Sequence, residues 1–512
     1  MFAQVNSLTT CGIDGVMILV EVDISNGLPN FDLVGLPAMA VRESKERVKA
    51  ALRNSKYPFP MTKITINLAP ADLRKEGSGL DLAIAIGLLT CSRMIDTEKL
   101  VDKVFIGELS LDGRLRKVSG VLSMIMEAKR FGAKEIFIPK ENAAEGKLIQ
   151  GIKVYTASVL SDVVEHLQGK KLLAPLPKQN ILQNEKRIYH VDFADVKGQA
   201  VARRALEIAA AGGHSILMVG SPGCGKTMLA RRLVTILPPM TESEALEVTK
   251  IYSIVGMLPA ADSVMLERPF RSPHHSISGS ALLGGGSTPR PGEVTLSHNG
   301  VLFLDELPEF ERSTLEMLRQ PLEDGEVSIS RVRAAMTFPS RFILVAAQNP
   351  CPCGFLGDSR HTCTCKYKDI ENYRKKISGP LMDRIDMQIN LSRVEFSELK
   401  DREPGESSAV IRERVVKARL LQQERLEQWG MHCNAQMGRS EVVKYCKLDE
   451  EAQHVMERYF NILNLSARSH DRILKVARTI ADLAASPNIT AAHIAEAVTL
   501  RTQSTHLHSP RL

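Results

Sequence analysis

The sequence contains no long apolar run. Within its 512 residues, no window holds eighteen or more apolar residues in a row, and the strongest candidate, Leu80 to Cys91, is interrupted by Asp81. A membrane-spanning helix needs about 20 such residues. The first ten residues, MFAQVNSLTT, also lack the basic stretch and the apolar core of a secretory signal. We therefore expect a cytoplasmic protein that has no membrane partner.

A disulfide framework and simple repeats are missing as well. Of the nine cysteines, five are scattered, and reduced, mostly buried thiols are the expected state for them. No short-period repeat and no long low-complexity tract is present. Neither sign of charge dominates, because 66 Lys and Arg stand against 59 Asp and Glu, a net charge of +7. This balance permits nucleic-acid binding without arguing strongly for it.

The chain is too long for a single hydrophobic core, so several domains are expected. Residues 169–189 are rich in Lys, Gln, Asn and Pro, which is typical of a linker. Strand-like and helical runs alternate before it, over 1–168, and again after it, over 190–398. Residues 399–512 show helical periodicity alone. We predict an α/β protein with a helical C-terminal domain.

The pattern GxxxxGK[ST] of a phosphate loop is complete at 220–227. An apolar run precedes it and a helical run follows it, which is the strand–turn–helix context that the motif requires. The glycines allow backbone N–H groups to turn toward phosphate oxygens, and the helix N-terminus adds positive charge. We expect ATP to bind here, through Gly220, Ser221, Pro222, Gly223, Cys224, Gly225, Lys226 and Thr227. The hydroxyl of Thr227 is a candidate ligand for Mg²⁺.

Two further apolar runs end in polar side chains. The run 301–304 leads into Asp305 and Glu306, a Walker B arrangement in which Asp305 binds Mg²⁺ and Glu306 activates the attacking water. The run 342–347 leads to Asn349, whose amide can contact the γ-phosphate and the attacking water. The presence of Glu306 favours hydrolysis over simple nucleotide binding.

This order of motifs resembles the AAA+ superfamily. The segment Ser378 to Asp386 resembles the AAA+ segment that carries the arginine finger, which places Arg384 at the γ-phosphate bound by a neighbouring subunit. Arg472 lies where a sensor-2 arginine is expected. An arginine that acts on a neighbour implies a ring or filament, and a homo-hexamer is the expected assembly.

Several longer segments narrow the resemblance. The chain resembles the YifB/ComM family of magnesium-chelatase-like AAA+ ATPases over essentially its whole length, on the segments FDLVGLP, RSPHH, GGG, PGEVTLSHNG and LDELPEF. The family implies a hexameric, DNA-dependent ATPase that is associated with branch migration. It also implies action on single-stranded and branched DNA during natural transformation, which makes recombination proteins candidate partners.

The N-terminal domain resembles the Lon-protease C-terminal fold, a ribosomal S5 domain 2-like fold. The likeness rests on the segments RKEGSG and FIPKEN. A Ser-Lys protease needs both groups within hydrogen-bond reach. The nucleophile position falls on Gly79, with Ser78 one residue away, and the position of the lysine base falls on Leu122. We therefore predict a non-proteolytic domain.

A β-hairpin is expected just before the Asn349 strand. Residues 326–331 alternate polar and apolar side chains, and 334–338 return after a short turn. In this AAA+ branch, such a hairpin lines the ring pore. Arg331 and Arg333 near its tip are candidates for phosphate contacts, which strengthen affinity without reading sequence. A solvated hairpin tip is the alternative.

Four cysteines form two CxC pairs with nine residues between them, at Cys351, Cys353, Cys363 and Cys365. Four thiolates suit a tetrahedral structural Zn²⁺ ion. His361 can replace one cysteine, an iron–sulfur cluster is a second candidate, and four free thiols are a third. For His274 and His275, packing or hydrogen bonding is the preferred interpretation over metal ligation.

Three functions remain open from the sequence. The first is a DNA motor, and the second is the ATPase subunit of a metal chelatase. The DxSxS motif of chelatase partner subunits is missing from this chain, although a separate subunit can supply it. The third is a protein remodeller, which would need an aromatic pore loop where the hairpin carries arginines. The fused Lon-like domain and the cysteine pairs favour the motor.

Overall fold

The computed structural model describes residues 1–75, 77–178, 189–258, 264–286, 289–331, 334–358, 360–393, 405–463 and 465–502. The chain divides into two compact units. One consists of Met1–Glu185 with Thr241–Leu266, and the other of Lys186–Met240 with Glu267–Leu512. Among the described helices, none is long and apolar enough to cross a membrane.

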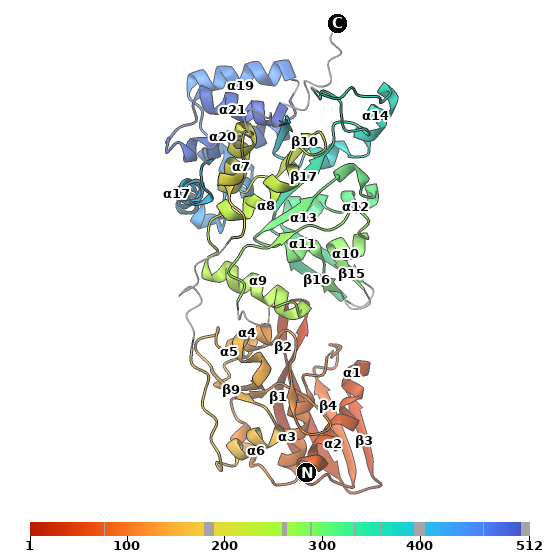
Figure 1. The fold of residues 1–512 in the computed structure, drawn as a ribbon. Coiled ribbons are helices and arrows are strands. Elements are labelled where there is room, and N and C mark those ends of the chain that lie inside the picture. The colour runs from red at the N-terminus through yellow and green to blue at the C-terminus, as the bar shows by residue number, and fades with distance from the viewer. Residues whose placement is uncertain are drawn as a thin grey trace. The chain divides into compact units, whose positions relative to one another are not determined.

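The N-terminal unit is built on a seven-stranded sheet in the order β3-β4-β2-β1-β5-β8-β9 (Figure 1). Its centre is the antiparallel pair β1 (Phe2–Cys11) and β2 (Asp14–Ser25). Strand β2 also pairs antiparallel with β4, and the other neighbours run parallel. The remaining strands are β3 (Asn30–Val34), β4 (Lys63–Ala69), β5 (Lys103–Phe105), β8 (Glu135–Pro139) and β9 (Lys153–Ala157), with the small hairpin of β6 (Glu108–Leu109) and β7 (Leu115–Arg116).

Helix α3 (Asp81–Cys91) is buried along its whole length against β1 and β2. Its sequence is apolar on every side, and a helix of that kind belongs inside a core rather than on a surface. The other helices of this unit are α1 (Met39–Arg42), α2 (Ser44–Asn54), α4 (Val121–Phe131), α5 (Ala143–Gly146), α6 (Leu160–Leu167) and α9 (Glu242–Val255). Short 3-10 turns cover Thr97–Leu100 and Lys140–Asn142.

Helix α9 joins the N-terminal unit although its sequence lies between the phosphate loop and the Walker B strand. It packs on α4 (Figure 1). The Ser253 hydroxyl donates to the buried Glu145 carboxylate, and the Gly120 N–H donates to the Ser253 carbonyl. Lys250 pairs with Asp14 at 2.8 Å. The predicted stretch 190–398 therefore contributes 241–266 to the other unit, and no shift in composition marks this departure.

The second unit contains a parallel five-stranded sheet in the order β11-β14-β17-β10-β18. The strands are β10 (Ile216–Gly220), β11 (Phe270–Arg271), β14 (Val301–Leu304), β17 (Ile343–Gln348) and β18 (Met387–Leu391). Two small antiparallel hairpins are added, β12 (Gly284–Gly285) with β13 (Arg290–Pro291), and β15 (Glu326–Arg331) with β16 (Ala334–Pro339). Because the five strands are parallel, their carboxyl ends share one edge, where ligands of such sheets bind.

Helices surround this sheet and continue into the C-terminal helical region, which packs beside α7 and α8 (Figure 1). One apolar core is common to the sheet, α7, α8 and the C-terminal helices. The α/β fold with a helical C-terminal region, as predicted, is confirmed. The helices are α7 (Ala200–Gly212), α8 (Lys226–Ile236), α10 (Gly279–Leu283), α11 (Glu293–Leu296), α12 (Arg312–Glu316), α13 (Arg319–Asp324), α14 (Tyr367–Lys375), α15 (Gly379–Met382), α17 (Ser408–Leu426), α18 (Arg439–Tyr445), α19 (Glu450–Leu463), α20 (Ala467–Leu483) and α21 (Ala491–Thr502).

Candidate functional site

The phosphate loop connects strand β10 to helix α8. Gly220 ends the strand and Lys226 begins the helix. The buried amine of Lys226 donates to the carbonyl oxygens of Gly220 (2.6 Å) and Ser221 (3.1 Å) and to Asn349 Oδ1 (3.1 Å). The helix N-terminus and the amine concentrate positive charge at one place, which is the electrostatic requirement for binding a phosphate chain.

The Walker B residues follow strand β14 at the same edge of the sheet. Thr227 Oγ1 donates to Asp305 Oδ2 at 2.7 Å, so the two predicted Mg²⁺ ligands are in direct contact. Glu306 adopts a left-handed backbone with a φ of 51°, which is uncommon outside glycine. Its N–H donates to Asp305 Oδ1 at 2.9 Å. A hydroxyl and a carboxylate are oxygen ligands of the type that Mg²⁺ prefers.

Asn349 directly follows strand β17, which lies between these two elements in the sheet. Strand β17 pairs with β14 on one side and with β10 on the other, so its end lies between the Walker B residues and the phosphate loop. The contact of Asn349 with Lys226 is the result. The structure thus brings together Lys226, Thr227, Asp305 and Asn349, while the side chain of Glu306 is 57% exposed at the rim.

Arg384, the predicted arginine finger, binds groups of its own chain outside the phosphate-binding edge. Its guanidinium donates to the carbonyl oxygens of Pro380 (2.7 Å) and Arg319 (3.1 Å), and to Glu323 Oε2 at 2.5 Å. Arg384 is buried, whereas Glu323 is 44% exposed. The guanidinium lowers the pKa of the Glu323 carboxyl, so this ion pair is formed at neutral pH.

Arg472, the predicted sensor-2 residue, is grouped with the Arg384 loop. It donates to the Arg384 carbonyl at 2.8 Å and forms an ion pair with Asp386. Burial acts to raise the pKa of the Asp386 carboxyl, but His214, Arg472 and Lys475 hold it well below its usual range. Asp386 is therefore a buried anion that connects the loop carrying Arg384 to helix α20.

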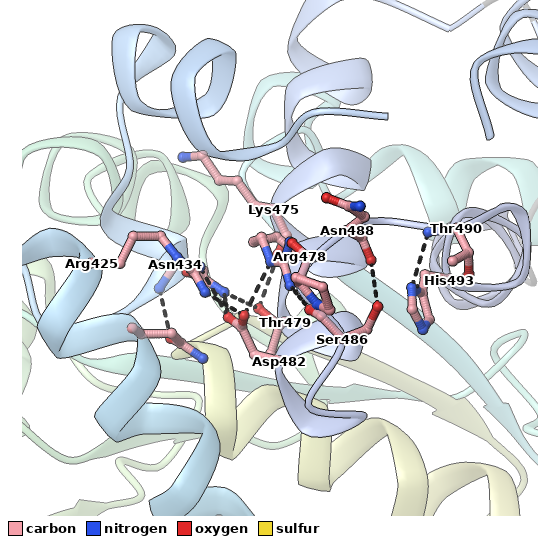
Figure 2. Close-up of polar contacts among 12 residues, drawn as sticks. Arg425, Asn434, Lys475, Arg478, Thr479, Asp482, Ser486, Asn488, Thr490 and His493 are labelled. Atoms are coloured by element: carbon pink, nitrogen blue, oxygen red, sulfur yellow. Dashed lines mark hydrogen bonds and ion pairs between the residues drawn. The ribbon is translucent and has the colours of Figure 1, made fainter. Parts of the chain in front are cut away.

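A buried polar network continues from Asp386 into the helical region. His214 precedes strand β10 and bridges Asp386 Oδ2 (3.1 Å) and Thr479 Oγ1 (2.8 Å). Figure 2 shows Arg425, Arg478 and Asn434 converging on Asp482, one turn beyond Thr479. Asn434 also donates to Thr479. The network links strand β10, the loop carrying Arg384 and helix α20.

The four cysteines of the CxC pairs form one cluster, and their sulfur atoms all lie within 4.8 Å of one another. Three of the Sγ–Sγ distances are 3.4, 3.7 and 3.7 Å, close to the separation of about 3.8 Å that four 2.3 Å zinc–sulfur bonds would give. Backbone N–H groups lower the pKa of Cys353 to about 6. Burial and the neighbouring thiols raise the pKa of Cys363 to about 12. The backbone N–H groups around Cys353 thus favour its thiolate, which is the form that binds a metal.

His361 does not join the cysteine cluster. Its ring stacks on Phe355, with centroids 4.8 Å apart, and its Nδ1 lies 3.4 Å from Asp358. Within the described part of the chain, the four cysteines alone make up the candidate metal site. These thiols have the geometry and chemistry that a structural zinc ion requires.

The loop that carries the cysteines packs directly on the phosphate loop. A Cβ atom at Gly354 would lie only 2.6 Å from Cδ of Pro222, so no larger residue fits there. Asp358 accepts a hydrogen bond from Ser221 and pairs with Arg393 at 3.0 Å. Any metal bound by the cysteines would therefore support the turn that holds phosphate.

The hairpin of β15 and β16 covers the residues for which one was predicted. Arg331 ends β15 and pairs with Ala334 in the register. Arg333 lies outside the described residues. The structure thus gives the position of Arg331 in the strand, and the proposed DNA contacts stay predictions.

Two relatives match nearly the whole length of the chain. It is 44% identical over 504 residues to "Competence protein ComM" of Haemophilus influenzae, covering 98% of this chain and 97% of that protein. It is 45% identical over 502 residues to "Uncharacterized protein YifB" of Escherichia coli K12, covering 97% and 96%. The chain belongs to the ComM/YifB family of magnesium-chelatase-like proteins. The predicted family is confirmed.

Three family profiles match successive parts of this ComM/YifB-family chain. "Magnesium chelatase, subunit ChlI" matches residues 192–399, "Subunit ChlI of Mg-chelatase" matches 20–142, and "Magnesium chelatase, subunit ChlI C-terminal" matches 405–501. Residues 192–399 therefore form an ATPase domain of the magnesium-chelatase type. The N-terminal region is also 25% identical over 175 residues to a "Lon protease" of Finegoldia magna, which covers 32% of this chain and 22% of that protein. The Lon-like character of the N-terminal domain is confirmed.

The N-terminal domain does not pair Ser78 with a lysine. The Ser78 hydroxyl donates to Glu108, and the buried Lys75 amine donates to the Pro70 carbonyl. At Gly79, the predicted nucleophile position, a Cβ atom would meet Val118 Cγ1 at 3.2 Å. Leu122, at the predicted base position, is fully buried. In this family member, apolar packing occupies both dyad positions.

Sequence reasoning gave no role at the ATP site to three residues that lie next to it. They are Glu323, which holds Arg384; His214, which holds Asp386; and His275, which lies 3.7 Å from Glu306. Of these, only His275 lies in a segment named in the sequence analysis, which is RSPHH. The other two partners are brought to the site by the fold, 61 and 172 residues from the groups they bind.

Proposed function

We propose that this chain is a DNA-dependent ATPase that works as a homo-hexamer. Its task would be branch migration, which extends the integration of single-stranded DNA during natural transformation. The observation that carries the proposal is the full-length, 44% identity to a protein named as a competence protein. The ATPase domain supplies the energy, and recombination proteins that act on the same DNA are the expected partners.

The hydrolytic step follows from the contacts at the sheet edge. Lys226, now bound to two carbonyls and Asn349, supplies the charge that the β and γ phosphates require. Thr227 and Asp305 would hold Mg²⁺, which neutralises charge that develops on the transferred phosphoryl group. Glu306, exposed at the rim, would orient the attacking water and take its proton.

The contacts of Arg384 support the proposed homo-hexamer. The groups that its guanidinium binds, on Arg319, Pro380 and Glu323, belong neither to the phosphate loop nor to the Walker B segment. An arginine that is directed away from its own site can complete the site of a neighbour, as arginine fingers do. Arg472 supports the same loop through Asp386, so its contribution would be to position Arg384.

DNA stimulation is the test of the motor. We expect ATP hydrolysis to rise when single-stranded or four-way-junction DNA is added at low salt. The double substitution Arg331→Ala and Arg333→Ala should spare basal hydrolysis and weaken the stimulation. It should also make DNA binding less sensitive to salt. The plot of log binding constant against log salt concentration should become shallower by about one for each lost phosphate contact.

Duplex DNA and heparin, a polyanion that is not a nucleic acid, serve as controls for the DNA experiment. A wild-type chain that neither binds DNA at low salt nor responds to it would overturn the motor. That result would leave the ATPase subunit of a metal chelatase as the better interpretation, because the family profiles bear that name. Strand movement that survives the double substitution would remove the hairpin from the mechanism.

The N-terminal domain is proposed to be non-proteolytic. Ser78 donates to a carboxylate, which cannot serve as the amine base of a Ser-Lys dyad. Val118 and Leu122 fill the space that the two catalytic groups would need. A platform that binds DNA or organises the ring is the role that remains.

The cysteine cluster is proposed to bind one structural zinc ion. Elemental analysis of the purified protein should find about one zinc per chain and no iron. Cys351→Ser with Cys363→Ser should remove the metal and lower the melting temperature, since structural zinc contributes directly to folding. ATP binding should also weaken, because the same loop contacts Ser221 and Pro222.

Cys11→Ser is the matched control for the zinc experiment, because Cys11 lies outside the cluster. It should leave the metal content and the melting temperature unchanged. A metal-free protein with full stability and activity would refute the site. Stoichiometric iron in place of zinc would assign the cluster to iron–sulfur chemistry instead.

A further inference from the structure

Helix α14 follows the cysteine loop and is attached to the ATPase domain by few of its own side chains. Of its nine residues, only Ile370 and Tyr373 are buried, and each is 8% exposed. They lie three positions apart and therefore share one face of the helix. The other residues of the helix are polar or charged. The place of α14 in the domain thus depends on what these two buried side chains contact.

The Tyr373 hydroxyl contacts the backbone at the end of strand β17. Its oxygen accepts a hydrogen bond from the N–H of Asn349, the residue whose Oδ1 accepts from Lys226 Nζ at 3.1 Å. The amine of Lys376 lies 5.6 Å from the centre of the Tyr373 ring, a cation–π contact that helps to hold the ring in place. Tyr373 therefore binds the backbone of a residue whose side chain binds the phosphate-loop lysine.

The hydroxyl of Tyr373 keeps its proton at neutral pH. Burial raises the pKa of Tyr373 to about 12, and the negative charges of Glu306 and Glu309 act in the same direction. The N–H of Asn349 acts in the opposite direction, because a donor to the phenol oxygen stabilises the ionised form, but burial outweighs it. The contact of Tyr373 with Asn349 thus joins two neutral groups, and it does not change with pH near neutrality.

This contact closes the loop that carries the cysteines. The chain leaves β17 at Asn349, passes through the four cysteines and returns in α14, where Tyr373 meets Asn349 again. Between these two ends, Asp358 accepts a hydrogen bond from Ser221 of the phosphate loop. A loop that is closed at its base and attached to the phosphate loop leaves Asn349 little freedom to move away from Lys226.

The placement of Asn349 bears on the rate of hydrolysis. An amide that contacts the γ-phosphate and the attacking water must be held at hydrogen-bond distance, and a misplacement of about 1 Å can cost 10²-fold in rate. The residue after Asn349 is Pro350, which has no N–H. The N–H of Asn349 is therefore the last backbone donor at the end of this strand, and Tyr373 is the group that binds it.

We infer that Tyr373 is a positioning residue for ATP hydrolysis. Its hydroxyl binds the Asn349 N–H and thereby fixes the Asn349 amide where the γ-phosphate and the attacking water meet. The inference rests on the proposed function, since it needs the predicted role of Asn349 in hydrolysis. It also gives α14 a role, because the helix connects the cysteine loop to the reacting groups.

Steady-state hydrolysis of ATP by Tyr373→Phe tests the inference. Phenylalanine keeps the ring and its packing and removes only the hydroxyl. We expect kcat to fall by about three- to tenfold, the rate equivalent of one ordinary hydrogen bond. The KM for ATP should stay near the wild-type value, because Lys226 keeps its contacts with the carbonyls of Gly220 and Ser221. The melting temperature of each variant shows that the protein is folded at the assay temperature.

A double-mutant cycle with Asn349→Ala shows whether Tyr373 acts through Asn349. Adding Tyr373→Phe to Asn349→Ala should not lower kcat further, because the effects of residues that act as a unit do not add. Tyr367→Phe is the matched control, since Tyr367 begins the same helix and is 81% exposed. It should keep the wild-type kcat and KM.

The outcomes separate the inference from the proposed function. If Tyr373→Phe keeps the wild-type kcat while Asn349→Ala is slow, the inference is overturned and the hydrolytic mechanism stands. Full additivity in the double variant also overturns it, because Tyr373 would then act on another group. A wild-type kcat in Asn349→Ala would remove the amide from the proposed mechanism, and the inference would fall with it.

Discussion

Replacing Glu306 by glutamine is expected to lower the rate of ATP hydrolysis by about 10²- to 10⁴-fold, the usual contribution of a general base. The amide keeps the size and the hydrogen-bonding reach of the carboxylate but cannot take a proton from water. Glu306 is 57% exposed, so the change leaves no buried group without a partner. Lys226, Thr227 and Asp305 are untouched, and ATP affinity should stay near the wild-type value. Single-turnover hydrolysis and binding of a fluorescent ATP analogue measure the two quantities.

Glu309→Gln is the matched control for this prediction. Glu309 lies on the same Walker B turn and pairs with Lys376 at 3.4 Å, on the surface. A surface pair of this kind contributes little to stability, and its loss should change neither binding nor hydrolysis. A Glu306→Gln enzyme that hydrolyses ATP at the wild-type rate would show that another group activates the water.

Replacing Arg384 by alanine is expected to lower hydrolysis by about 10³-fold, which is the lower range for an arginine finger. ATP binding should be little changed, because the guanidinium contacts neither the phosphate loop nor the Walker B residues of its own chain. The decisive measurement is a mixture of Arg384→Ala with Lys226→Ala subunits. The first retains a phosphate loop and the second a finger, so mixed rings should regain activity that neither variant has alone.

Two controls accompany the Arg384 experiment. Glu323→Gln removes the carboxylate that holds the guanidinium, and it should keep or raise hydrolysis, since Arg384 is then freer to reach a neighbour. The melting temperature of Arg384→Ala shows whether the buried position tolerates the change. A mixture that is no more active than its separate components would mean that Arg384 does not act across subunits.

The residues of the ATP site could be predicted because each belongs to a short, local pattern. Lys226 and Thr227 follow a strand after a short glycine-rich turn, and Asp305, Glu306 and Asn349 each follow an apolar run. Parallel strands place their carboxyl ends at one edge, so residues that end separate strands meet there. The cysteine cluster could be predicted for the same reason, since both CxC pairs lie within one loop between β17 and α14.

Two elements of the N-terminal unit could not be predicted from the local sequence. Strand β1 (Phe2–Cys11) is half polar and was not predicted, yet it lies at the centre of the N-terminal sheet, paired with β2 along its whole length. Helix α9 was assigned to the ATPase core by its place in the sequence, and it packs on α4 of the other unit. In both cases a partner distant in the chain decides the position, and local composition carries no trace of that partner.

By itself, the sequence determined the family and the fold class, and it predicted which residues bind and hydrolyse ATP, because all of these depend on the order of motifs along the chain. The tertiary structure alone decided that Glu323 holds Arg384, that His214 and Arg472 hold Asp386, and that His275 stands beside Glu306. Such pairs form between side chains of elements that lie far apart in the sequence and meet only in the folded chain. Periodicity and spacing report which faces are buried, but they do not report which charge meets which.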